Sequence, residues 1–135
     1  MVTYALDASA LLRFLDDEAG SLKVSEILNR HVEGDCAVIV CALHWGEMAG
    51  ILYRRDGRRE LDRVLSRLSS VGMQKIPVTH ERAVRAAILT ADLKIPYADA
   101  LGIELAENVP CTFVTADYEL KPAANRAEII FLPSK

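Results

Sequence analysis

The chain has 135 residues, of which 51% are hydrophobic and 26% are charged, and its formal net charge is −3. This length suits a single domain over residues 1–135, and the composition is that of a folded rather than a disordered chain. The acidic balance excludes nucleic-acid binding through a general basic field, so any such role needs a local basic patch or bound metal ions.

Neither a secretory leader nor a membrane span is expected. The N-terminal residues lack a basic region followed by a long apolar run, and no apolar run approaches the roughly 20 residues that span a bilayer. The three cysteines, Cys36, Cys41 and Cys111, are odd in number and lack C-x-x-C spacing, which disfavours a disulfide framework or a zinc site. A cytoplasmic protein is the expectation.

In the N-terminal half, strands and helices alternate. Residues 2–6 predict a short buried strand, and residues 9–15 a helix capped by Asp7 or Ser9. A second helix is expected around residues 22–28, followed by a β-branched strand over 37–40. Helices over 43–55 and 58–68 come next, the second with an apolar face opposite its arginines.

The C-terminal half continues the alternation. Residues 76–78 predict a short strand, which Pro77 confines to a sheet edge. Helices are expected over 81–93 and from Pro96 to about Asn108, with strands over 112–115 and 128–132. Strands that alternate with helices predict an α/β fold, with a parallel sheet covered by helices on both faces.

Four acidic residues stand at unusual places in this pattern. Asp7 and Asp117 each follow a predicted strand, and in parallel sheets functional groups collect beyond the carboxyl ends of the strands. Glu47 shares a helix face with Leu43 and Ile51. Asp99 shares one with an apolar set three to seven residues later, Gly102, Ile103 and Ala106. An acid on an apolar, inward face needs a partner or a cation.

Each acid also has a simpler interpretation. Glu47 could pair with an arginine such as Arg13, and Asp99 lies in a first helical turn, where the helix dipole favours an acid. Asp7 and Asp117 could each cap the helix or turn that follows. Together the four favour a site for Mg²⁺ or Mn²⁺, because these hard cations prefer carboxylate oxygens and would relieve the mutual repulsion of the acids.

Four motifs carry a family resemblance across essentially the whole chain. Residues 4–12, Y-A-L-D-A-S-A-L-L, resemble the opening of PIN-domain nucleases, and H-W-G-E-M at 44–48 resembles their helical glutamate. P-Y-A-D-A-L-G-I at 96–103 resembles their A-D-A helix, and F-V-T-A-D at 113–117 their T-x-D. Short single-domain members are mostly VapC-type toxins of toxin–antitoxin pairs.

The resemblance implies a PIN-like three-layer α/β/α sandwich with about five parallel strands and a Mg²⁺- or Mn²⁺-dependent endoribonuclease. It also implies a homodimer and an inhibiting antitoxin. By this resemblance Asp7, Glu47, Asp99 and Asp117 are the acidic positions. We expect Asp7, Asp99 and Glu47 to hold the metal, with Asp117 further out, and Ser9 and Thr115 to orient carboxylates. Ser9 could equally be a helix cap, and Thr115 an ordinary β-branched strand residue.

RNA contact requires positive charge. Arg54 and Arg55 belong to the densest basic run and could flank the site, and Arg13 could face the substrate or an antitoxin. A solvated helix end is an equally good interpretation of that run. The three histidines, His31, His44 and His80, are scattered and predict neither a catalytic base nor a metal site.

Three other functions compete with a toxin. A phosphatase that forms an aspartyl-phosphate also has an aspartate after its first strand, but usually a second one two residues later, where this chain has Ser9. A non-catalytic α/β module could use the acids for a structural metal or for helix caps. A PIN nuclease could also act in RNA maturation, outside a toxin pair.

Overall fold

The computed structural model describes residues 1–134 and contains one parallel sheet of five strands, in the order β3-β2-β1-β4-β5. The strands are β1 (Val2–Leu6), β2 (Cys36–Cys41), β3 (Gln74–Ile76), β4 (Thr112–Thr115) and β5 (Ile129–Phe131). The helices are α1 (Ala8–Leu15), α2 (Ser21–Val32), α3 (Ala42–Asp56), α4 (Arg58–Ser69), α5 (His80–Leu93), α6 (Tyr97–Asn108) and the 3-10 helix η1 (Tyr118–Ala123). The predicted α/β class and the parallel sheet are confirmed. No helix of the described residues is long and apolar enough to cross a membrane.

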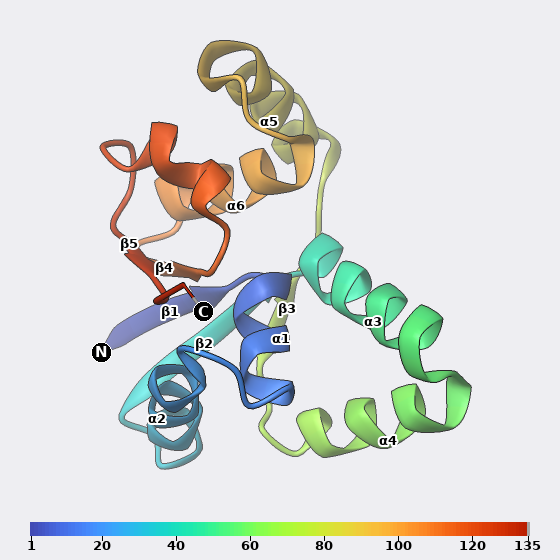
Figure 1. The fold of residues 1–135 in the computed structure, drawn as a ribbon. Coiled ribbons are helices and arrows are strands. Elements are labelled where there is room, and N and C mark those ends of the chain that lie inside the picture. The colour runs from blue at the N-terminus through green and yellow to red at the C-terminus, as the bar shows by residue number, and fades with distance from the viewer. Residues whose placement is uncertain (135) are drawn as a thin grey trace.

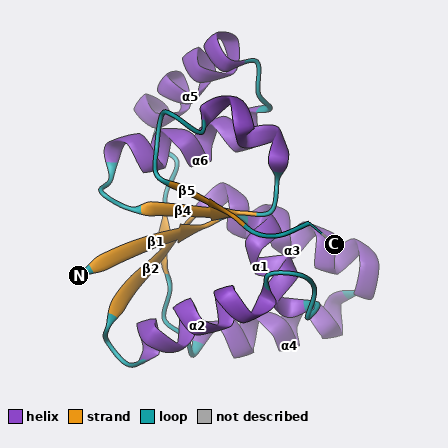
Figure 2. Ribbon diagram, turned by 60° about the vertical axis from the view of Figure 1, so that its left-hand side comes forward, coloured by secondary structure: helices purple, strands orange, loops and turns teal. Residues whose placement is uncertain are grey.

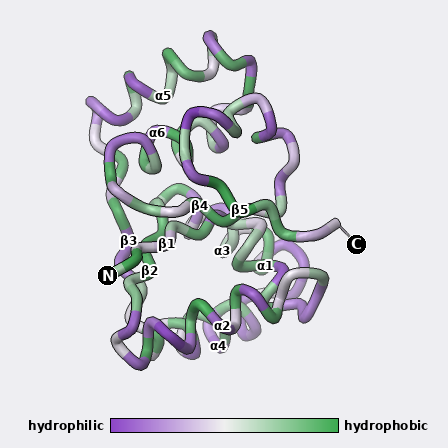
Figure 3. Tube along the Cα trace, turned by 90° about the vertical axis from the view of Figure 1, so that its left-hand side faces the viewer, coloured by the Kyte–Doolittle hydropathy of each residue, from purple (hydrophilic) through white to green (hydrophobic). Residues whose placement is uncertain are grey.

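The sheet separates two layers of helices (Figures 1 and 2). Helices α1 to α4 cover one face, and α5, α6 and η1 cover the other. Alternate residues of one strand enter different cores: Leu6 of β1 packs with the α1–α4 layer, and Ala5 packs with the α5–α6 layer. In Figure 3, hydrophobic residues are concentrated in the strands between the two helix layers, whereas hydrophobic and hydrophilic residues alternate along the helices.

Two connections follow from local sequence. The strand β3 is at the sheet edge and is paired only with β2, as predicted, but it covers Gln74–Ile76 and not 76–78, because it ends directly before Pro77, which has no N–H to donate to a ladder. Asp7 directly follows β1 and caps α1, because its side chain accepts a hydrogen bond from the N–H of Ala10. The change from strand to helix therefore occurs at the residue that sequence analysis places in the site.

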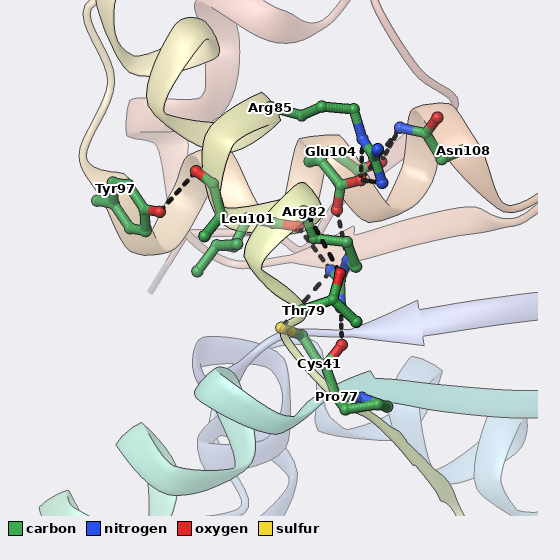
Figure 4. A network of polar contacts seen from close by, with 10 residues as sticks. Cys41, Pro77, Thr79, Arg82, Arg85, Tyr97, Leu101, Glu104 and Asn108 are labelled. Carbon is green, nitrogen blue, oxygen red and sulfur yellow. Dashed lines mark hydrogen bonds and ion pairs between the residues drawn. The ribbon is translucent and has the colours of Figure 1, made fainter.

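The α5–α6 layer is joined by a buried ionic network (Figure 4). Glu104 of α6 is 1% exposed and accepts hydrogen bonds from Arg82 (2.6 Å) and Arg85 (2.9 Å) of α5. Arg82 also donates to the carbonyl oxygen of Pro77, at 2.6 Å. Because breaking a buried ion pair leaves an uncompensated charge, this network holds α6 firmly against α5 and the end of β3.

Candidate active site

The acidic residues gather at the point in the sheet where the strand order changes direction. The strands β1, β2 and β3 are added towards one edge, whereas β4 and β5 extend the sheet on the other side of β1. Leu6 at the end of β1 is paired with Val114 of β4, so Asp7 and the β4–η1 connection lie beside one another. Such a switch point at the carboxyl ends of parallel strands is the usual place for a ligand.

Asp7 is the most rigidly held of the four acids. It is 5% exposed, and its Oδ1 accepts hydrogen bonds from Ser9 Oγ (2.6 Å) and Ala10 N (2.9 Å). Its Oδ2 accepts from Thr115 Oγ1 at 2.5 Å. Burial raises the pKa of the Asp7 carboxyl above its usual range, while these hydrogen bonds act in the opposite direction.

The hydroxyl groups of Ser9 and Thr115 bridge Asp7 and the β4–η1 connection by hydrogen bonds. Ser9 Oγ donates to Asp7 and accepts from Ala116 N at 2.8 Å. Thr115 Oγ1 also donates to Asp7, and it accepts from Asp117 N at 3.0 Å. Each hydroxyl thus has both a carboxylate and a backbone partner, and the two together fix Asp7 to the segment that carries Asp117.

Asp99 and Asp117 form the electrostatically strained part of the site. The pKa of Asp99 is raised to about 8, first by partial burial and then by the negative charge of Asp117. Oδ2 of Asp99 is buried and has no hydrogen-bond partner among the described residues. Asp117 caps η1 as well, because its Oδ1 accepts from Glu119 N at 2.9 Å.

Glu47 lines the pocket, but it does not lie on a buried apolar face of its helix as the sequence predicts. The apolar stripe through Leu43 and Ile51 is not the buried face of α3: Glu47 is exposed, and Leu43 is 37% exposed. The helix is amphipathic in another direction, with His44, Met48 and Leu52 inward. Partial desolvation still raises the pKa of Glu47, as do the charges of Asp7 and Asp117.

His44 is the site residue that sequence analysis missed. It is 2% exposed and lines the same pocket as the four acids. Its Nε2 donates to the carbonyl oxygen of Ala98 at 2.8 Å, and a positive charge on its ring would lower the pKa of both Asp7 and Glu47. The signal in the sequence is that His44 precedes Glu47 by three residues, which makes the two side chains neighbours on α3 although one is buried and the other exposed.

One pocket of about 190 Å³ unites these groups. It is lined by Asp7, Ala8, Ser9, Leu12, His44, Glu47, Ile51, Asp99 and Asp117. Three carboxyl groups with raised pKa values and one unpaired buried oxygen make a donor set that fits a hard divalent cation. Among the described residues, however, no group of three or more His, Cys, Asp or Glu side chains is arranged closely enough in this structure to hold an ion.

Comparison with known families decides the identity of the fold. A family model described as the PIN domain matches residues 4–126. The chain belongs to the PIN-domain family. PIN domains are generally nucleases. A search of curated protein sequences gives no significant match.

Solved structures with the same PIN fold include toxin–antitoxin complexes. VapBC2 from Rickettsia felis, bound to a DNA fragment from its promoter, has a TM-score of 0.76 at 12% identity, with 98% of this chain and 100% of that chain covered. DNA-bound VapBC from Salmonella typhimurium has a TM-score of 0.73 at 12% identity, covering 97% and 98%. PAE2754 from Pyrobaculum aerophilum has a TM-score of 0.65 at 22% identity, covering 95% and 90%. At these identities the likeness is one of fold.

The three arginines considered for RNA contact differ in how free they are on this PIN domain. Arg13 donates to the carbonyl oxygens of Ala19 and Pro133, at 2.7 and 2.8 Å, and not to Glu47. Arg55 makes two hydrogen bonds of 2.9 Å to Asp16 and one of 3.0 Å to Asp56. Arg54 is exposed and has no ion pair within residues 1–134.

Proposed function

We propose that this PIN domain is an endoribonuclease that depends on Mg²⁺ or Mn²⁺ and cleaves RNA phosphodiester bonds at the acidic pocket. The observation that carries the proposal is the convergence of Asp7, Glu47, Asp99 and Asp117 on one pocket at the switch point of the sheet. The raised pKa values of Asp7, Glu47 and Asp99 indicate repulsion and desolvation that a cation would offset.

Asp7 and Asp99 would be the principal metal ligands, with Glu47 and Asp117 completing the set. A bound cation would activate a water molecule and stabilise the charge that develops on the phosphodiester. Asp7 is suited to a fixed position because Ser9 and Thr115 hold its two oxygens. Asp99 is suited to direct binding because its Oδ2 has no hydrogen-bond partner within residues 1–134.

The remaining two acids would have different tasks. Glu47 is exposed at the rim, where its carboxylate can orient the attacking water or accept a proton from it. Asp117 Oδ1 is engaged with the N–H of Glu119, which leaves its second oxygen to act on the cation or on a water beside it. Asp7 is a poor nucleophile for an aspartyl-phosphate, because both its oxygens already accept hydrogen bonds.

Asp7→Asn tests this function. Asparagine keeps the size and the cap on Ala10, and its amide can donate to Thr115 Oγ1, so the variant should fold with little change in its melting temperature. Without the charge it should lose at least about 100-fold in RNA cleavage, in keeping with the loss expected when an electrostatic contact to the reacting groups is removed. Asp35→Asn, at an exposed position before β2, is the control for charge alone. A folded Asp7→Asn protein that cleaves RNA at the wild-type rate in Mn²⁺ would refute the proposal.

We further propose that this nuclease is the toxin of a toxin–antitoxin pair, neutralised by a cognate antitoxin protein. The support is the family together with the fold shared with VapBC complexes over nearly the whole of both chains. A cytoplasmic location, in contact with cellular RNA, would follow from that role. Homodimerisation stays a prediction. A PIN nuclease of RNA maturation is the alternative.

Growth separates these two roles. Expression of the wild-type chain should arrest growth, and Asp7→Asn should relieve the arrest, because toxicity then depends on the acidic pocket. Growth without arrest at the same level of folded wild-type protein would favour the maturation nuclease.

A further inference from the structure

His44 is a buried polar residue of the pocket wall to which the proposed chemistry gives no task. Its side chain lies in the first turn of α3 and is almost completely enclosed. Its Nε2 lies 2.8 Å from the carbonyl oxygen of Ala98, in the first turn of α6. Because a carbonyl oxygen only accepts, the proton of this hydrogen bond is on Nε2.

The orientation of the His44 ring lowers stability, because it leaves one ring nitrogen buried without a hydrogen bond. With the proton on Nε2, the Nδ1 of a neutral ring is an acceptor, and this buried atom has no partner among the described residues. An apolar side chain of similar size would fill the space without leaving a polar atom unpaired. Packing alone therefore does not account for a histidine, whereas the bond to Ala98 does.

The slot around the ring leaves it little freedom. The ring centroid lies 6.2 Å from that of Phe113, with the planes tilted by 57°. A Cβ on Gly102 of α6 would lie 3.1 Å from His44 Cε1, so α6 approaches the ring closely only because residue 102 has no side chain. Among residues 1–134, the His44–Ala98 bond is the hydrogen bond that joins α3 to α6.

We propose that His44 is a positioning residue that sets the separation between Glu47 and Asp99. Ala98 directly precedes Asp99, and His44 stands one helical turn before Glu47, so the bond joins the two turns that carry these acids. The inference rests on the proposed function, because the separation matters only if both carboxylates serve one cation.

The negative charges of the pocket explain why a hydrogen bond between α3 and α6 would be needed. Glu47 and Asp99 lie on different helices of different layers, and each feels the repulsion of Asp7 and Asp117. Asp7 and Asp117, in contrast, are tied to each other through Ser9 and Thr115. The His44 bond supplies the equivalent restraint for the second pair, and groups that orient metal ligands in this way commonly affect metal affinity.

Mn²⁺ binding to three proteins tests the proposal, measured by the loss of the free Mn²⁺ signal in electron paramagnetic resonance. His44→Leu keeps the bulk of the ring but removes the donor. His44→Gln is long enough to bring an amide N–H to the position of Nε2. We expect His44→Gln to bind Mn²⁺ within about threefold of wild type, and His44→Leu to bind roughly tenfold or more weakly. RNA cleavage should show the same order, with kcat affected more than KM.

His31→Leu is the matched control. His31 also bridges two segments, because its Nδ1 accepts from Val38 N at 3.1 Å and its Nε2 lies 3.3 Å from Gly72 O, but it does not line the pocket. Its replacement should lower the melting temperature without changing Mn²⁺ affinity. If His44→Leu does not fold, His44→Asn, whose amide is too short to reach Ala98, replaces it.

The outcomes separate this inference from the function on which it rests. Wild-type Mn²⁺ affinity in a folded His44→Leu or His44→Asn protein would overturn the positioning role alone. Equal weakening in His44→Gln would also overturn it, because the donor at Nε2 would then be irrelevant. A wild-type protein that binds no Mn²⁺ would overturn the proposed metal-dependent function, and the inference with it.

Discussion

At the scale of single residues, the pocket contains two kinds of acid. Asp7 has every oxygen engaged by hydroxyl or backbone donors, so its position is set before any ligand arrives. Asp99 is the opposite case: its buried Oδ2 has no hydrogen-bond partner among the described residues, and its pKa is raised to about 8. When it is ionised, the second kind is electrostatically unfavourable, and protonation or the proposed cation would relieve this cost.

The raised pKa of Asp99 predicts how stability changes with pH when no metal is bound. In the unfolded chain this carboxyl titrates near its ordinary value of 3.8, whereas in the fold it holds its proton up to about pH 8. The stabilising contribution is therefore complete below about pH 4, falls as the pH rises, and is lost above about pH 8. The raised pKa values of Asp7 and Glu47 act in the same direction.

Asp99→Asn should flatten this dependence, because an amide does not ionise. Melting temperatures in EDTA at pH 5, 6.5 and 8 should fall steadily for wild type and less steeply for the variant. At pH 8 the metal-free variant should be the more stable protein, and Mn²⁺ should raise the melting temperature of wild type more than that of the variant. Parallel pH curves for the two proteins would show that Asp99 is not under strain.

At the scale of elements, the position of α6 depends on close approach to its neighbours. Gly102 faces β4, and an added Cβ there would lie 2.5 Å from Phe113 Cζ, well inside contact distance. Phe113 is fully buried, so its ring has no open space to enter. The glycine thus lets α6 lie on the sheet near enough for Ala98 to meet His44 and for Asp99 to enter the pocket.

Gly102→Ala and Gly46→Ala form a matched pair. Both glycines lie inside helices without a positive φ, and at Gly46 an added Cβ meets nothing within 4 Å. Gly46→Ala should stabilise the fold by up to about 1 kcal/mol through helix propensity. Gly102→Ala should destabilise it by about 1–2 kcal/mol net, because overpacking of a dense core outweighs that gain. Urea unfolding measures both, and a stabilising Gly102→Ala would show that α6 can move away freely.

At the scale of the whole molecule, the net charge is −3, so the proposed RNA substrate would have to be met by local positive charge. Two of the four arginines between residues 54 and 59 are already engaged with acids: Arg55 with Asp16 and Asp56, and Arg58 with Asp62. Arg54 and Arg59 are exposed and have no such partner in the part of the chain described by the structure, and of these two only Arg54 lies on α3 with Glu47. We therefore expect Arg54 to be the arginine of this run that reaches a phosphate.

Arg54→Ala should weaken RNA binding and reduce its dependence on salt. One lost phosphate contact lowers the slope of log affinity against log salt by about 0.7 for single-stranded RNA. Arg55→Ala removes the same formal charge from a paired side chain, so it should change this slope less. Fluorescence anisotropy at several salt concentrations, with the catalytically impaired Asp7→Asn background, gives both slopes. An unchanged slope for Arg54→Ala would remove Arg54 from the RNA-binding surface.

The order of the elements and the ends of the strands could be predicted from the sequence. Hydrophobic periodicity and turn residues are local signals, and they located all five strands of the sheet to within about two residues, a usual margin for strand ends. Asp7 and Asp117 follow directly from those boundaries, because parallel strands present their carboxyl ends at one edge. The capping interpretation of both residues is confirmed, because Oδ1 of each accepts a hydrogen bond from a backbone N–H of the helix that follows, and both residues also line the pocket.

Only the tertiary structure decided which inward acids belong to the pocket. Glu104 lies two residues after Gly102 and is more deeply buried than any of the four, yet it is neutralised by Arg82 and Arg85 on the far side of α6. Glu47 reaches the pocket from the exposed face of α3, and His44 reaches it from the buried face. Local sequence determines where a side chain lies on its own helix. Whether an acidic side chain is paired depends on residues from a distant segment, and only tertiary packing brings that segment near.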